Sequence, residues 1–500
     1  MTQVKLHRAR AFVDCMMITA SAAGYRFDPW NWWRHTDDLW RWGVRLRELW
    51  LEGLADEAMR EALRQQRIAA LLAHARSRSG FYREHYRDVA HDCTDLASHP
   101  AVTRAQLMRH FDQWVTDPAL RLHELQAFIA DPARVAEPYL GRYTVWTSSG
   151  TTGVPGVYVQ DPDAMAVYAA LLSARFEFDP NAGDPWRMMG GASRVALIAA
   201  TGGHFAGVVW WERMCRIHPA VAANARVFSI MQPLAQLVAQ LNDWQPVFLA
   251  SYPTMLGLLA QEQRAARLRI RPRSLWSGGE GLTGADRSAI GEAFGCDVIE
   301  DYGASECMNI AFGCRHGGLH LNDTWVVLEP VDEHLRPVPP GQPSATVLLT
   351  NLANQVQPVI RYDLGDSIAL GTAPCPCGAR HPTLRVEGRR DDVLELQAAG
   401  RSRVRLLPLA IETVLEEEAG IARFQLTQTA PDALSLRIEA RSERQRAAAF
   451  RRAAKALGRY FEQQGAPAVR LSCEAGAPQA NPVSGKLRRV RALSAAQRLA

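Results

Sequence analysis

Hydrophobic positions follow helical spacing through the first part of the chain. Few glycines or prolines interrupt the sequence between Asp37 and Arg78, and apolar residues recur near helical spacing at Leu46, Leu49, Leu54, Leu63, Ile68 and Leu72. We therefore expect residues 1 to about 140 to be mainly helical.

A different pattern begins at Val195. Short β-prone runs, at 195–199, 246–250, 274–276 and 297–299, alternate with helical stretches at 233–241, 254–266 and 285–294. Such alternation is typical of βαβ units with a largely parallel sheet covered by helices. A β-rich stretch follows over roughly 319–370. The pattern predicts an α/β fold.

The most favourable place for a domain boundary is the segment from Glu387 to Asp392, where a glycine and a charged cluster separate two patterned regions. We predict a large N-terminal domain over residues 1–388, with its β-rich subdomain, and a small C-terminal α/β domain over 389–500. The sequence shows no internal repeat.

Composition narrows the class of protein. The chain has 500 residues, of which 47% are hydrophobic and 22% charged, so it can bury a large core. It contains no apolar run of about 18–20 residues, the length that crosses a membrane. Three basic residues precede an apolar stretch near the N-terminus, but Asp14 interrupts it. We expect a cytoplasmic protein that acts without a membrane.

The positive charge is unevenly distributed. Residues 441–500 hold thirteen Arg and Lys against three Glu, a local excess of ten. This basic segment is either a solvated face or a surface that attracts an acidic partner or a phosphorylated ligand. We do not expect nucleic acid as the partner, because no aromatic residues are interleaved with these arginines for stacking.

The run Thr147-Ser-Ser-Gly-Thr-Thr-Gly153 is rich in hydroxyls and glycines. Glycine lets successive N–H groups converge on an anion, and the hydroxyls add further donors. A β-prone run precedes it and a helix-like stretch, Asp163 to Leu172, follows soon after. We therefore interpret it as a phosphate-binding loop. The alternative is a flexible linker.

Other polar clusters directly follow the β-prone runs of the predicted sheet. In parallel sheets, ligands collect beyond the carboxyl ends of the strands. The clusters are Ser251-Tyr-Pro253, Ser277-Gly-Gly-Glu280 and Glu300-Asp-Tyr-Gly-Ala-Ser-Glu306, and two further motifs, Arg361-Tyr-Asp-Leu-Gly-Asp366 and Asn481-Pro-Val-Ser-Gly-Lys486, lie downstream.

In this order the motifs resemble the adenylate-forming superfamily of acyl-CoA synthetases and adenylation domains, most closely its phenylacetate-CoA-ligase-like branch. The resemblance covers about residues 80–492. It implies an enzyme that uses ATP and Mg²⁺ to activate a carboxylic acid as an acyl-adenylate, with a mobile C-terminal lid domain. The acyl group then passes to the thiol of coenzyme A or of the phosphopantetheine on an acidic acyl carrier protein.

The resemblance also implies residue roles. The ATP phosphates would be held by Thr147, Ser148, Ser149, Gly150, Thr151, Thr152 and Gly153, and the remaining ATP contacts would come from Gly279, Glu280, Asp301, Tyr302, Gly303, Ser305, Asp366 and Arg389. Lys486 would be the catalytic lysine, Glu306 would help to hold Mg²⁺, and Asp391 would be the hinge. The chain has only three lysines among 57 basic residues, which adds weight to Lys486. The loop departs from the family where Val154 replaces a lysine, so we expect weaker ATP binding.

Cysteines and histidines form two clusters on either side of the β-rich stretch, comprising Cys307, Cys314, His316, His320, Cys375, Cys377 and His381. Pairs of soft ligands from two loops are what a closed tetrahedral zinc site needs. The resemblance singles out Cys314, His320, Cys375 and Cys377. The alternative is a set of unliganded thiols.

The acid is expected to bind near His204, Phe205, Tyr252, Ala304 and Met308, although His204 is equally explained as a core histidine. Apolar and aromatic residues here favour an aryl or other hydrophobic acid. A rival hypothesis is a non-catalytic module that binds nucleotide or carrier protein, motivated by Val154 and the basic C-terminus. The sequence leaves open whether the protein is a monomer or a homodimer.

Overall fold

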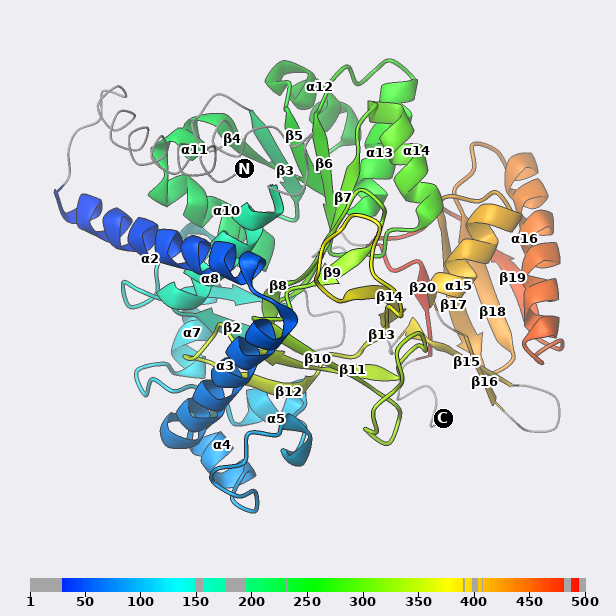
Figure 1. Cartoon of the computed structure of the whole chain (residues 1–500). Helices are drawn as coiled ribbons and strands as arrows, with labels where there is room; N and C mark the ends of the chain where they lie inside the picture. Colours follow the sequence, from blue (N-terminus) through cyan, green and yellow to red (C-terminus); the bar gives the residue numbers. More distant parts are fainter. Residues whose placement is uncertain are drawn as a thin grey trace.

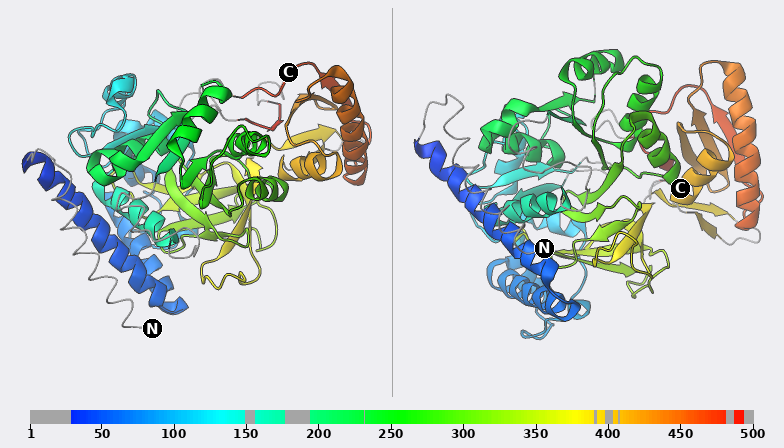
Figure 2. Two further views of the ribbon diagram at one scale, coloured as in Figure 1. Left: turned by 90° about the horizontal axis from the view of Figure 1, so that it is seen from above. Right: turned by 45° about the horizontal axis from the view of Figure 1, so that its top comes forward.

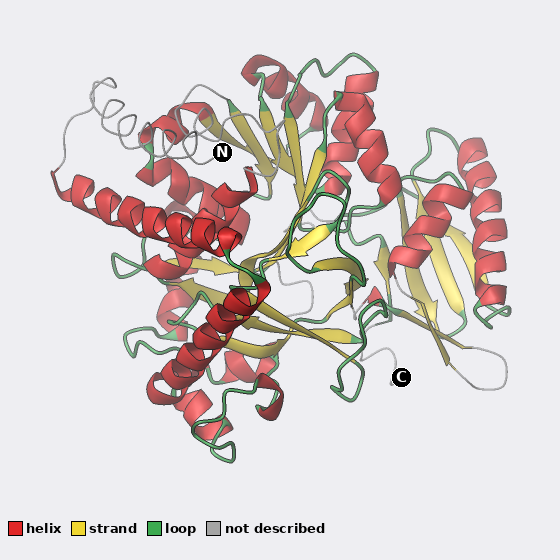
Figure 3. Ribbon diagram, in the orientation of Figure 1, coloured by secondary structure: helices red, strands yellow, loops and turns green. Residues whose placement is uncertain are grey.

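A nine-stranded mixed sheet forms the framework of the large body (Figures 1 and 3). The computed structural model describes residues 29–148, 156–176, 194–230, 232–389, 392–397, 403–406, 408–480 and 487–493. The strand order is β13-β14-β9-β8-β7-β6-β5-β3-β4, parallel from β4 to β7 and antiparallel from β7 to β13. The strands are β3 (Val195–Ala199), β4 (Ala225–Ser229), β5 (Phe248–Ser251), β6 (Ser274–Gly278), β7 (Val298–Ala304), β8 (Cys307–Gly313), β9 (Leu319–Leu321), β13 (Asp366–Leu370) and β14 (Thr383–Arg389).

Helices cover one face of the parallel half of this sheet. They are α12 (Leu234–Trp244), α13 (Pro253–Arg264) and α14 (Gly284–Phe294). Their apolar sides meet the strands in a core that includes Leu237, Leu249, Leu256, Leu275 and Ile290, each at most 1% exposed. Burying each such side chain contributes about 1.5–3 kcal/mol. The predicted α/β fold is therefore confirmed, and helices and strands alternate close to the positions predicted.

The described N-terminal part of the chain, from residue 29 to about 140, is mainly helical, as predicted. Its helices are α2 (Pro29–Leu54), α3 (Glu57–Arg78), α4 (Gly80–His85), α5 (Arg104–Arg109), α6 (Phe111–Trp114) and α7 (Leu122–Ile129). Asp56 caps α3 by accepting the N–H of Met59 at 2.8 Å. In Figure 2, α2 lies at the opposite end of the molecule from the helix coloured orange, α16 (Glu443–Gln463). Within the described ranges, no helix has the length and apolar character to span a membrane.

Smaller sheets and helices complete the large body. One antiparallel sheet contains β10 (Val326–Val331), β11 (Thr346–Asn351) and β12 (Val359–Asp363), and another pairs β1 (Thr144–Thr147) with β2 (Val157–Gln160). The helices α8 (Pro162–Phe176), α10 (Ala206–Ile217) and α11 (Pro219–Asn224) accompany them. The strands β9 to β13 fall within the β-rich stretch predicted over 319–370.

The described residues between 392 and 493 form a C-terminal unit beside the sheet, coloured from yellow through orange to red in Figure 1. A hairpin, β15 (Leu394–Gln397) and β16 (Arg403–Leu406), precedes a sheet of order β19-β18-β17-β20. The remaining elements are α15 (Pro408–Thr413), a π-helical turn (Val414–Glu418), β17 (Phe424–Ala430), β18 (Ala433–Ile438), α16 (Glu443–Gln463), β19 (Arg470–Glu474) and β20 (Val490–Arg491). The buried apolar residues of this unit make a cluster of their own. The boundary at 388/389 stays a prediction.

The backbones of β7 and β8 approach each other closely at Gly303. A Cβ atom placed on Gly303 would lie 1.9 Å from the carbonyl oxygen of Met308, a distance that no side chain tolerates. Glycine is therefore required here by space, and the hairpin sets the path of the segment from Asp301 to Glu306.

We predict that Gly303→Ala will distort this hairpin and lower the melting temperature by several degrees, because backbone must move to admit the methyl group. Gly257→Ala in α13 is the matched control, since a Cβ there meets no atom within 4 Å and alanine favours a helix. Equal melting temperatures for the two variants, measured by calorimetry, would contradict this account.

Candidate active site

A cavity of about 1640 Å³ opens beyond the carboxyl ends of β5, β6 and β7 and extends to β13, β14 and the C-terminal unit. Fifteen of the predicted site residues line it: Thr147, Ser148, Phe205, Tyr252, Gly279, Glu280, Asp301, Tyr302, Gly303, Ala304, Ser305, Glu306, Met308, Asp366 and Arg389. Motifs more than 200 residues apart in the sequence thus meet at one edge of the sheet, where ligands of open α/β sheets bind.

Several predicted residues lie outside the described part of the chain. They are Ser149, Gly150, Thr151, Thr152, Gly153, Asp391 and Lys486, together with Val154. Their roles stay predictions.

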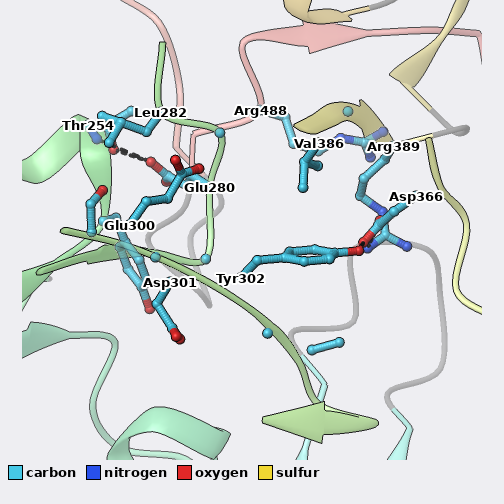
Figure 4. A pocket seen from close by; sticks show the side chains of 18 of the residues that line it. Thr254, Glu280, Leu282, Glu300, Asp301, Tyr302, Asp366, Val386, Arg389 and Arg488 are labelled. Carbon is cyan, nitrogen blue, oxygen red and sulfur yellow. Dashed lines mark hydrogen bonds and ion pairs between the residues drawn. The ribbon is translucent and has the colours of Figure 1, made fainter. Parts of the chain in front are cut away.

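Asp366 and Tyr302 form a buried pair on one wall of the cavity (Figure 4). The hydroxyl of Tyr302 donates to Oδ2 of Asp366 at 2.8 Å, and Nη1 of Arg389 lies 3.3 Å from Oδ1. Asp366 and Arg389 are also opposite each other in the β13–β14 ladder. Burial, and then the Asp366 carboxylate, raise the pKa of Tyr302, so it remains a neutral donor. The group combines an aromatic face, a hydrogen-bond acceptor and a cation.

Glu306 is buried in the turn between β7 and β8, with 7% of its surface exposed. The hydroxyls of Tyr158 and Tyr362 both donate to its Oε1, at 2.5 and 2.6 Å. Burial, followed by the Glu306 charge, raises the pKa of both tyrosines, which keeps their protons on the phenols. The two phenols therefore fix the orientation of this carboxylate.

Sequence reasoning did not assign either tyrosine a role. Tyr158 is 148 residues and Tyr362 is 56 residues from Glu306, so no local spacing relates them. Tyr362 does belong to the Arg361–Asp366 motif, which was the only available signal.

Two residues at the start of the predicted phosphate loop are fixed by backbone contacts. The N–H of Thr147 donates to the carbonyl of His204 at 2.7 Å, and the N–H of Ser148 donates to that of Gly156 at 3.0 Å. The Ser148 hydroxyl accepts the Gly156 N–H at 2.9 Å in return. Residues 148 and 156 therefore close the base of the loop beside the cavity.

Most residues of the predicted acid pocket line an apolar and aromatic part of the cavity. Phe205, Tyr252, Ala304 and Met308 line the cavity there, together with Trp210 and Trp211. His204 is not among the lining residues. Its ring is 1% exposed and packs on Phe128, with Nε2 3.2 Å from the carbonyl oxygen of Asp131. This placement corresponds to the core-histidine alternative.

Cys314, His320, Cys375 and Cys377 lie together, with their ligand atoms all within 4.8 Å of one another. The sulfurs of Cys314 and Cys375 are 3.6 Å apart, and Nε2 of His320 is 3.3 Å from the sulfur of Cys377. Two thiolates at the ~2.3 Å Zn–S distance are about 3.8 Å apart in a tetrahedral site. Nδ1 of His320 faces the carbonyl of His381 at 3.3 Å, which leaves Nε2 for the cluster. The four donors fit a tetrahedral metal ion.

A second layer surrounds this cluster. Nδ1 of His381 lies 2.9 Å from Oδ1 of Asp323, and Asp323 also pairs with Arg60 of α3. Cys307 is buried in the main core instead, beside Tyr168. The Cys314, His320, Cys375 and Cys377 cluster is therefore connected to helix α3 through His381, Asp323 and Arg60.

Comparison with known proteins establishes the family. The model of the AMP-binding enzyme family matches residues 52–347, more than half of the chain. The chain belongs to the AMP-binding enzyme family.

Individual relatives agree with this assignment. The phenylacetate-coenzyme A ligase of Thermus thermophilus is 25% identical over 381 residues, covering 73% of this chain and 77% of the relative. The phenylacetate-coenzyme A ligase of Aromatoleum evansii is 24% identical over 343 residues, covering 65% and 70%. A crystal structure of 2-hydroxyisobutyryl-CoA ligase in the postadenylation state, with an adenylate bound, has a TM-score of 0.63 at 22% identity and covers 89% of this chain and 92% of that one. This likeness shows the fold.

Proposed function

We propose that this protein is an AMP-forming acid:thiol ligase that activates a hydrophobic carboxylic acid and transfers it to coenzyme A. The main support is that five predicted site residues line one cavity: Thr147, Tyr302, Glu306, Asp366 and Arg389. Membership of the AMP-binding enzyme family and the names of the ligase relatives support it.

In the first half-reaction, a carboxylate oxygen of the acid attacks the α-phosphorus of ATP. The new O–P bond forms as the bond to the β-phosphate breaks, and pyrophosphate leaves. In the second, a thiolate attacks the acyl carbon and AMP leaves. The first step brings two anions together, so preorganised hydrogen-bond donors and cations lower its activation barrier by several kcal/mol.

The residues divide this work. The ring of Tyr302 offers a flat apolar face to the adenine, while the Asp366 carboxylate accepts hydrogen bonds from the ribose hydroxyls. Arg389 supplies a charge near the ribose and phosphates. Lys486 is proposed to approach both the carboxylate and the α-phosphate, because its compact ammonium is not committed to a bidentate grip.

Mg²⁺ is proposed to bind beside Glu306, where it would neutralise phosphate charge. The donor set fits, because a buried carboxylate oriented by two phenols offers the oxygen ligand that this ion prefers.

The acid is proposed to occupy the apolar side of the cavity. Phe205, Trp210, Trp211 and Met308 provide aromatic and soft surfaces at which an aryl ring could pack. Hydroxybenzoates and phenylacetate are therefore the first candidates, ahead of long fatty acids.

The thiol that accepts the acyl group belongs either to coenzyme A or to a carrier protein. The names of the relatives favour coenzyme A, and a structural neighbour with a TM-score of 0.51 was crystallised with an adenylate and CoA in its thioesterification state. The exposed arginines of α16, among them Arg444 and Arg451, also suit an acidic carrier protein. A holo carrier protein is therefore the alternative acceptor.

A structural zinc ion is proposed at Cys314, His320, Cys375 and Cys377. Its four-ligand set would be closed, so the metal would stabilise the loops and take no part in the reaction.

We expect pyrophosphate release that requires ATP together with an aryl acid from a panel of carboxylates. Parallel reactions with coenzyme A and with holo carrier protein, followed by mass spectrometry, will identify the thioester. A reaction without acid is the control. A non-catalytic binding module would release no pyrophosphate with any acid.

Lys486→Ala should abolish adenylate formation, because the cation that joins carboxylate and α-phosphate is lost. Transfer from preformed acyl-adenylate to the thiol should persist, since its electrophile is already activated. Exposed Lys455 on α16 provides the control, Lys455→Ala. Retention of adenylate formation in Lys486→Ala would refute the proposed role.

Metal analysis of the purified protein should return about one zinc per chain. Cys375→Ser should lose the metal and melt at a lower temperature, whereas Cys473→Ser, which replaces an exposed cysteine in the C-terminal unit, should retain both properties. Zinc below about a tenth of an equivalent in folded wild-type protein would contradict the site.

A further inference from the structure

The segment Leu487–Arg489 joins the C-terminal unit to the large body through polar contacts. Within the C-terminal unit it leads into β20, and the N–H of Leu426 in β17 donates to the carbonyl of Arg489 at 2.7 Å. Toward the large body it contacts Glu280 and Asp286. The segment immediately follows Lys486.

Glu280 holds the first of these contacts. Its Oε1 accepts the N–H of Leu487 at 2.9 Å, while Oε2 accepts the N–H and hydroxyl of Thr254 at 3.2 and 2.8 Å (Figure 4). Thr254 lies in the first turn of α13, so the carboxylate also benefits from the positive end of that helix. One carboxylate thus connects α13 to the backbone beside Lys486.

The contact with Glu280 involves the peptide group directly after Lys486. The N–H of Leu487 belongs to the planar peptide group that joins Lys486 to Leu487. The contact with Glu280 therefore fixes the orientation of the Leu487 N–H, directly after Lys486 in the sequence.

Asp286 holds the second contact. Its Oδ2 lies 2.8 Å from Nη2 of Arg489, and both side chains are largely buried, at 15% and 7% exposure. Asp286 lies in the first turn of α14. Thr283 caps this helix, because its hydroxyl oxygen accepts the N–H of Asp286 at 3.0 Å. The helix therefore presents this carboxylate in a fixed position.

Arg489 is held equally firmly on its own side. It pairs with Glu416, and its Nη1 lies 3.6 Å from Oε2 of Glu412. The neighbouring Arg488 pairs with Asp392, next to the predicted hinge. The guanidinium of Arg489 thus bridges acids from both parts of the protein.

We propose that Glu280 and Asp286 are positioning residues that dock Leu487 and Arg489 on the large body and so hold Lys486 for the adenylation half-reaction. This inference rests on the proposed ligase function. It gives Glu280, predicted as an ATP contact, a role toward the lid as well. Asp286 is not among the residues that line the cavity, which separates its role from nucleotide binding.

The test uses the full-length chain with Asp286→Asn, which keeps the size of the side chain and removes its charge. Acid-dependent exchange of pyrophosphate into ATP should fall about tenfold or more, as for removal of one partner of a buried charge pair. The KM for ATP should change less than about twofold, and thioester formation from preformed acyl-adenylate should be maintained. Glu292→Gln is the control on the same helix, because Glu292 is 76% exposed and 3.9 Å from Arg264.

Hydrogen exchange provides a measurement that does not require activity. The amide of Leu487 should exchange several-fold faster in Asp286→Asn than in wild type, while amides of α16 remain unchanged. If the Asn variant does not fold, Asp286→Ser replaces it, since serine suits the first turn of a helix.

The outcomes separate the two hypotheses. Absence of pyrophosphate exchange in wild type with every acid would refute the proposed function, and the Leu487 amide would still report the docking. Equal losses in both half-reactions, unchanged adenylation, or unchanged exchange at Leu487 would each overturn the positioning role.

Discussion

The position of β7 within the sheet determines where the site lies. On one side β7 pairs in parallel with β6, and on the other it turns back into antiparallel β8. The end of β7 therefore carries Asp301 and Tyr302 next to Gly278 of β6, and the following turn carries Glu306. Because Gly303 allows the two strands to approach closely, β7 ends at Ala304 and the chain turns back through Ser305 and Glu306, and these three residues line the cavity.

The two buried carboxylates of this cavity, Asp366 and Glu306, are held by tyrosine hydroxyls. Tyr302 donates to Asp366, and Tyr158 and Tyr362 donate to Glu306. Each phenol satisfies an oxygen of a buried carboxylate that would otherwise lack a hydrogen-bond donor. This arrangement is preorganised, because the surrounding strands fix the tyrosines before any ligand binds.

The sequence was sufficient to predict the alternation of strands and helices and the edge of the sheet at which the motifs meet. Both follow from local periodicity and from polar clusters directly after apolar runs. Strand β4 was not predicted, because Arg226 interrupts the apolar run Ala225–Ser229. The roles of Tyr158 and Asp286 were also not predicted. Each depends on pairing between segments far apart in the chain, 203 residues in the case of Asp286 and Arg489, and such pairing leaves no spacing to recognise. At His204 the neighbouring Phe205 of the same motif lines the cavity, but packing turns the His204 ring toward Phe128 and Asp131.

The C-terminal unit keeps its apolar residues in a cluster separate from those of the large body. The contacts that join the two parts at Leu487 and Arg489 are hydrogen bonds and an ion pair, which water can replace when they separate. Separating the two parts at these contacts would therefore leave both apolar clusters closed. Polar contacts of this kind resemble those of a transient protein complex, although both partners belong to one chain.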